Sequence, residues 1–303
     1  MITLHMKPEV SGVEWSRFCA EAPPFSIALD GYVPGPPRLD TAAPCASFNH
    51  HEGVDRLSTR STCAQVLLAL RMGLYERFRD SDGPRADVFA NDCDEDVCLA
   101  WTILNNPHLA DDPANPILNR LVGVEDLLDC TAGMYPMHKD SPILRELAWV
   151  FEPYRQFRLS GQLNRREVSA FASIVKDVEG RILRYVVGHG DTMALDTRYE
   201  VLFRGNGWLG VREIGAQARV GLVSDGCRAF VSVRQRGDGR WTYSIGRLSP
   251  FVAPDLSALC SALNAIEPGW GGGDTIIGSP RPSGSALLPD ELFAMVAGLE
   301  VGR

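Results

Sequence analysis

The sequence predicts an α/β protein of two domains, and three observations point to that class. Short apolar runs that suit buried strands alternate with segments of helical periodicity through the first half of the chain. Strict alternation of apolar and polar residues, at 199–203 and 241–245, indicates a more strand-rich second half. The length of 303 residues is also typical of two domains. We expect an N-terminal domain with a mainly parallel sheet flanked by helices, and a smaller C-terminal α/β domain.

The N-terminal half contains three apolar runs that are short enough to be buried strands, at 25–29, 46–48 and 86–90. After the second run, apolar residues recur at helical spacing from 63 to 74, and Thr62 with Gln65 suits a capping box at the start of that helix. A further helix is expected at 97–104. Polar residues follow each strand, at the strand end where open α/β sheets bind ligands.

The remaining elements define the domain boundary. Helices are expected at 118–128 and 143–151, and the mixed stretch 165–187 predicts a helix that passes into a strand. The boundary is placed there, which gives domains at 1–160 and 186–303 joined by a connecting segment at 161–185. In the C-terminal domain we expect a hairpin turning at Gly237-Asp238-Gly239, and then a helix at 256–263, a strand at 275–277 and a last helix at 292–299.

Composition limits the class of partner. The net charge of −8 excludes a generally basic surface for nucleic acid. No apolar run approaches the length of a membrane span, and the N-terminus has no signal-peptide apolar region. The 8 cysteines are scattered without a Cys-x-x-Cys pair, which suits free thiols in a reducing cytoplasm.

Two polar clusters carry the candidate chemistry. Asn49-His50-His51 follows the second strand, and both imidazoles reach one site only if the chain turns there, for which Gly53 is suited. Asp92 and Asp94 follow the third strand within a run of four acids in five residues, and carboxylates at i and i+2 suit Mg²⁺ or Mn²⁺. The alternatives are surface histidines on a loop and acids that cap the following helix.

Two single carboxylates complete the candidate metal site. Asp30 ends the first strand, and Asp129 ends the apolar helical stretch at 118–128. Taken alone, each is equally suited to a cap or a turn.

These residues resemble the DHH phosphoesterase superfamily, whose name-giving Asp-His-His is similar to Asn49-His50-His51. The family's Asp-x-Asp element resembles Asp92-Cys93-Asp94, and its single aspartates resemble Asp30 and Asp129. The C-terminal part resembles the DHH-associated domain, in which a glycine-rich loop binds the substrate's phosphate. The resemblance spans nearly the whole chain, through short motifs. It implies a DHH-like metal-binding domain at 1–160 and a substrate-binding domain at 186–303.

Three departures from the family pattern bear on catalysis. Asn49 replaces the signature aspartate, and Asp274 replaces the histidine of the glycine-rich loop. The Asp-x-Asp element also follows the histidine pair in this chain, whereas in the family it precedes it.

The resemblance implies two-metal hydrolysis in a cleft between the domains. Mn²⁺ or Mg²⁺ would be held by His50, His51, Asp92 and Asp94, with Asp30 and Asp129 as further ligands, and His50, His51 and Asp92 would be the catalytic residues. Arg247 and the amides of Gly271, Gly272 and Gly273 would meet the phosphate, although a surface salt bridge and a plain turn are the alternatives.

The substrate class is a small phosphate-bearing compound, with a short nucleic acid as a second candidate. The rival functions are a non-catalytic relative that binds a nucleotide or metal, favoured by Asn49 and Asp274, and a scaffold that keeps only the fold.

Overall fold

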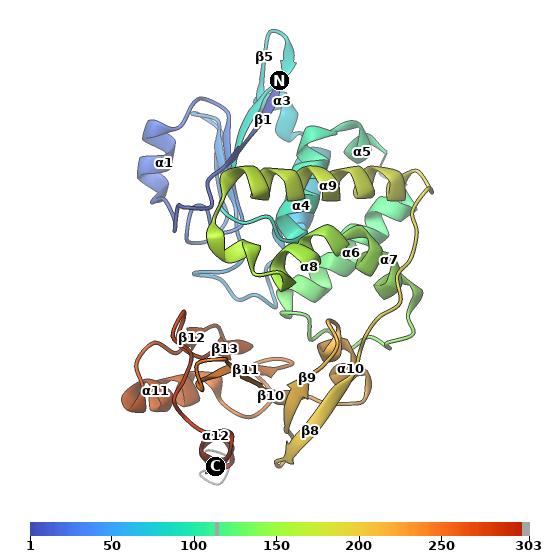
Figure 1. Ribbon diagram of the computed structural model, residues 1–303. Helices are drawn as coiled ribbons and strands as arrows, with labels where there is room; N and C mark the ends of the chain where they lie inside the picture. The colour runs from blue at the N-terminus through green and yellow to red at the C-terminus, as the bar shows by residue number, and fades with distance from the viewer. Residues whose placement is uncertain (113–114, 299–303) are drawn as a thin grey trace. The chain divides into compact units, whose positions relative to one another are not determined.

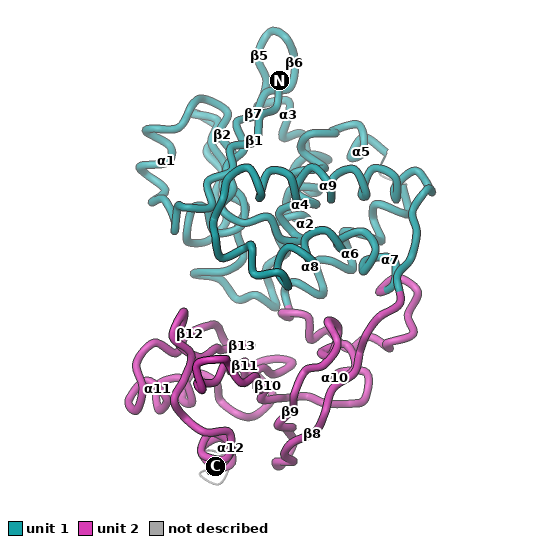
Figure 2. Tube along the Cα trace, in the orientation of Figure 1, with its two compact units in different colours: residues 1–130, 145–193 teal, residues 131–144, 194–303 magenta. Residues whose placement is uncertain are grey.

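The computed structural model describes residues 1–112 and 115–298 (Figure 1). The chain divides into two compact units, drawn in teal and magenta in Figure 2. Unit 1 comprises residues 1–130 and 145–193, and unit 2 comprises residues 131–144 together with the chain from 194 onward. Residues 161–185, expected to connect the domains, therefore belong to unit 1. Residues 131–144 interrupt the chain of unit 1 and belong to unit 2.

The sheet of unit 1 confirms the expected α/β class with a mainly parallel sheet. Its strand order is β1-β7-β2-β4-β3, with β1, β7, β2 and β4 parallel and β3 antiparallel to β4. The strands span β1 (Ile2–Met6), β2 (Ser26–Leu29), β3 (Arg38–Asp40), β4 (Cys45–Phe48) and β7 (Ala86–Ala90). This order places the carboxyl ends of β7, β2 and β4 side by side, although β7 comes much later in the chain.

Every residue of β2 and β4 is buried, as expected of strands covered on both faces. One face packs against α1 (Trp15–Glu21), where Phe18 meets Ala28 and Tyr32. The helices α2, α4, α6 and α9 lie on the other side of the sheet (Figure 1). Helix α7 (Pro142–Val150) begins in unit 2 and continues into unit 1. The other helices and short strands of unit 1, besides α1, are α2 (Thr62–Arg71), α3 (Leu74–Arg77), β5 (Arg79–Asp80), β6 (Gly83–Pro84), α4 (Glu95–Asn105), α5 (His108–Asp111), α6 (Pro116–Cys130), α8 (Glu152–Leu159), η1 (Gln162–Arg165) and α9 (Val168–Val186).

The expected change from helix to strand within 165–187 is wrong, because α9 is helical throughout. Its buried residues recur at helical spacing, from Phe171 through Val175 and Val178 to Ile182. This stripe packs against α4 and α8. The β-branched residues near the end of α9 favour a strand by local propensity, but packing against α4 and α8 outweighs that preference.

Unit 2 contains a separate mixed sheet, with strand order β12-β13-β11-β10-β9-β8. The expected hairpin is confirmed by the antiparallel pairing of β10 with β11, and the last expected helix is α12. Residue 299 of that prediction lies outside the described residues. The elements are β8 (Tyr199–Arg204), β9 (Leu209–Glu213), α10 (Ala218–Ser224), β10 (Ala229–Gln235), β11 (Trp241–Arg247), α11 (Leu256–Ile266), β12 (Gly271–Gly272), β13 (Ile276–Gly278) and α12 (Pro289–Gly298).

Candidate metal centre

Histidine and aspartate side chains converge at the carboxyl ends of β2 and β4. Asp30 follows β2, and His50 and His51 follow β4. Asp96 lies in the first turn of α4, and Asp129 lies near the end of α6. The sequence predicted four of these five residues as metal ligands, and Asp96 is the addition.

His50 lies at the centre of the cluster. Its Nε2 is 2.7 Å from Oδ2 of Asp129, 3.4 Å from Oδ1 of Asp30 and 3.7 Å from Oδ2 of Asp96. The Nε2 of His51 is 2.8 Å from the same Oδ1 of Asp30. His50 thus belongs to two groups of three donors, one with Asp30 and His51 and one with Asp96 and Asp129. Within each group the donor atoms lie within 4.8 Å of one another.

The donor atoms fit a metal ion. The Nε2 of His50 and Oδ2 of Asp129 are both buried, and neither has a hydrogen-bond partner in the described chain despite their proximity. The two atoms form an ion pair that lacks hydrogen-bond geometry, and a bound cation would satisfy both of them. Imidazole nitrogen and carboxylate oxygen are donors that divalent metals accept. These buried groups can hold a metal ion.

The electrostatics of the cluster point the same way. Burial and the charges of Asp129 and Asp30 raise the pKa of Asp96 to about 7. Burial opposes ionisation of Asp30, but the adjacent His50 and His51 outweigh it and hold that pKa well below its usual value. Burial likewise opposes a charge on His50, but Asp129 and Asp30 raise its pKa to about 12. A divalent cation would replace the proton and relieve the carboxylate repulsion.

Asn49 makes the turn that brings both histidines to the site. Its Oδ1 accepts hydrogen bonds from the backbone amides of His50 (2.8 Å) and His51 (3.1 Å). Its Nδ2 donates to the carbonyl of Gly35 and to Oε2 of Glu52. The side chain is fully buried and both of its ends are bonded. Its amide, which an aspartate lacks, therefore has a structural use at the departure from the Asp-His-His signature.

Asp96 joins the metal centre to the start of α2. Its Oδ2 accepts from the amide of Thr62 and its Oδ1 from the amide of Cys63, both at 2.7 Å. The expected capping box between Thr62 and Gln65 is wrong, because Ser61 is the N-cap residue and has no side-chain cap bond. Gln65 donates instead to the carbonyls of Asn49 and Arg60.

Asp92 and Asp94 lie beside the cluster but in neither group of three donors. Asp94 caps α4, since its Oδ1 accepts from the amide of Val97 at 2.9 Å, which agrees with the alternative of a helix cap. Both carboxylates line a pocket of about 500 Å³ together with Asp30 and His51. Burial and neighbouring carboxylates raise the pKa of Asp94 well above its usual value. Their part in metal binding stays a prediction.

In unit 2, Arg247 is buried and donates to backbone carbonyls. Its Nε bonds the carbonyl of Asp274 at 2.7 Å, and its Nη1 bonds those of Val252 and Pro254 at 3.0 and 2.9 Å. Gly271 and Gly272 form the short edge strand β12 and are exposed, as is Gly273. A phosphate contact for this segment stays a prediction.

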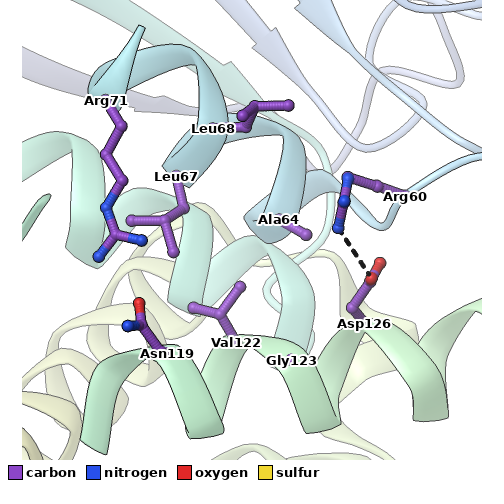
Figure 3. A pocket seen from close by; sticks show the side chains of 9 residues that line it. All are labelled: Arg60, Ala64, Leu67, Leu68, Arg71, Asn119, Val122, Gly123 and Asp126. Atoms are coloured by element: carbon purple, nitrogen blue, oxygen red, sulfur yellow. Dashed lines mark ion pairs between the residues drawn. The ribbon is translucent and has the colours of Figure 1, made fainter. Parts of the chain in front are cut away.

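A second pocket, of about 240 Å³, lies between α2 and α6 (Figure 3). Leu67 and Val122 contribute apolar side chains to it, and Arg60 pairs with Asp126 at 3.8 Å. None of the metal-centre residues lines it.

The chain has no match among known protein-family models, curated proteins or solved structures. Among the described helices, none is long and apolar enough to cross a membrane. The motifs in the chain and the geometry of the metal centre are therefore the grounds for a functional assignment.

Proposed function

We propose that this protein is a metal-dependent phosphoesterase, a divergent relative of the DHH superfamily, that hydrolyses a small phosphate-bearing substrate with Mn²⁺ or Mg²⁺. The observation that carries the proposal is the buried convergence of imidazole and carboxylate donors, where Nε2 of His50 and Oδ2 of Asp129 lie 2.7 Å apart without a hydrogen bond. A nucleotide or a short oligonucleotide is the preferred substrate. The free cysteines suit action in the reducing cytoplasm.

The residues of the cluster have different roles in the proposed reaction. Nε2 of His50 is the donor in both groups, and a nitrogen with one lone pair binds one cation, so the two groups surround a single position for a divalent ion; Mn²⁺ and Mg²⁺ are such ions. When bound, such ions supply Lewis acidity and lower the pKa of a water molecule. His51, partly exposed at the pocket, and Asp30 hold the side of the centre that a substrate can reach. Asp92 and Asp94 border the same pocket and are the further ligands that the Asp-x-Asp resemblance implies.

The test uses the full chain, purified without chelator and analysed for metal content. The Mn²⁺-loaded protein is then assayed against a phosphomonoester, a phosphodiester and pyrophosphate. We expect one or two bound ions and metal-dependent hydrolysis of at least one compound, lost in His51→Ala and kept in His138→Ala. His138 is a matched control because it is an exposed histidine of unit 2. Bound metal without hydrolysis would favour the non-catalytic relative, and absence of metal binding would refute both.

A further inference from the structure

The pocket beside the metal centre has one permanently cationic side chain. Its walls are formed by ten residues, all from unit 1. Four of them are acidic, and His51 and Arg166 are the basic ones. The pocket walls are Pro8, Glu9, Val10, Ser11, Asp30, His51, Asn91, Asp92, Asp94 and Arg166. A phosphate entering this pocket meets strong repulsion from the carboxylates unless cations neutralise them and a fixed positive charge holds it.

Arg166 is held at the pocket by an uncommon backbone conformation. It follows η1 directly and has a left-handed φ of 55°. The described chain has four non-glycine residues with positive φ, and two of them, Asp30 and Arg166, line this pocket. Strained residues of this kind persist when the surrounding structure enforces them, and they are frequent at functional sites.

The guanidinium of Arg166 is held by a hydrogen bond and has further N–H groups that could donate to a ligand. Its Nη1 donates to the carbonyl of Pro8 at 2.7 Å, which ties it to another wall of the pocket. Within the described chain it forms no ion pair, whereas Arg155 pairs with Glu95 and Arg181 with Glu152. Its charge acts on the nearby carboxylate of Asp92, and its remaining N–H groups are available to a ligand.

We propose that Arg166 binds a phosphate oxygen of the substrate, so that unit 1 holds both the metal centre and the anion-recognition residue. The inference rests on the proposed function, which makes the ligand a phosphate ester. A planar guanidinium binds phosphate through charge-assisted, paired hydrogen bonds. Its charge persists at any physiological pH, and we expect the contact to be strongest when metal ions neutralise the carboxylates. Arg247, which the sequence motif offered for this role, already donates to three carbonyls.

Orthophosphate serves as the probe, titrated calorimetrically into the full chain with and without Mn²⁺. Arg166→Ala is compared with Arg166→Lys and with Arg165→Ala, and metal content is measured for each variant. Arg165 is the matched control because it is an exposed arginine one residue away that does not line the pocket. Circular dichroism melting curves for all variants verify that each is folded.

We expect Arg166→Ala to weaken phosphate binding by roughly 10- to 100-fold, the usual effect of losing hydrogen bonds to a charged group. Arg166→Lys should recover part of the loss, and Arg165→Ala should bind as the unchanged protein does. Metal content should be the same in all variants. Equal phosphate affinity in Arg166→Ala and the unchanged protein, or no phosphate binding by the unchanged protein in either arm, would overturn the inference. Because metal content is measured separately, either result can occur while the metal centre itself is upheld.

Discussion

The metal centre of unit 1 and the Arg247 segment of unit 2 look alike in sequence, since each combines polar residues with a strand end and a turn. In the structure they differ in how their polar atoms are satisfied. Arg247 donates to the carbonyls of Asp274, Val252 and Pro254 and thereby holds two loops together. At the metal centre, Nε2 of His50 and Oδ2 of Asp129 are buried without a hydrogen bond. The contrast shows that a polar motif can be used entirely in supporting the fold, whereas converging donors without hydrogen bonds can hold a metal ion.

The largest effect is expected from removing His50, the residue that the two donor groups share. In His50→Ala both donor groups lose a member, so we expect Mn²⁺ affinity to fall by more than about 100-fold, beyond the loss typical of an outer-shell partner. Calorimetric titration and elemental analysis measure the loss, with His138→Ala as control. Unchanged affinity in His50→Ala would place the metal elsewhere.

The converse change tests the Arg247 segment. Arg247→Met removes the donor from three carbonyls, of which those of Val252 and Pro254 are buried, and we expect the free energy of unfolding to fall by about 2–3 kcal/mol in urea. Metal content should not change. Arg234→Met, at an exposed arginine of β10, should leave stability unchanged. A variant that keeps its stability while losing phosphate affinity would give Arg247 the binding role that the motif implies.

The pH dependence of metal binding tests whether His50 is a ligand. In the metal-free protein Asp129 and Asp30 outweigh burial and raise the pKa of His50 to about 12, so the imidazole carries a proton at neutral pH. Metal binding must release that proton. Mn²⁺ affinity should therefore increase about tenfold for each pH unit above about pH 7, and more steeply below it, where Asp96 also carries a proton. Calorimetry in buffers of different ionisation enthalpy counts the released protons directly. Binding that is independent of pH would mean that His50 is not a ligand.

The smallest effect is expected at Asn49. Asn49→Asp restores the family signature but turns a donor into an acceptor facing the Gly35 carbonyl and Glu52, both of which accept hydrogen bonds. We expect the free energy of unfolding to fall by about 1 kcal/mol, with no additional bound metal. Adding Glu52→Gln should recover part of the loss. An additional equivalent of Mn²⁺ in Asn49→Asp would show that position 49 can act as a ligand.

Much of the centre could be predicted from the sequence, because residues that follow parallel strands gather at one edge of the sheet. That rule located Asp30, His50 and His51 before their distances were known. It could not supply the strand order, in which β7 inserts between β1 and β2. The acidic motif comes after the histidine pair in the chain, but this strand order still makes the ends of β7, β2 and β4 neighbours in the sheet.

Asp96 and Arg166 could not be found in the same way, because tertiary packing defines both. An acid in the first turn of a helix suits that helix's own N-terminus by default. Asp96 turns to α2 only because α2 packs against α4. Arg166 lies in a segment that the mixed pattern suggested as a connection between domains, and its place at the pocket depends on η1 and on the loop at Pro8.

The hydrogen bonds from Asp96 to the first amides of α2 have a consequence for how the protein acquires its ion. In the proposed metal-bound form, the carboxylate that joins α2 to α4 would also be a ligand, so its position is fixed by the fold before any cation binds. The cation would then bind to a site that is already folded, and binding would require no refolding of the chain. On the proposed function, a cell short of the metal would keep folded apoprotein that binds the ion when the supply returns.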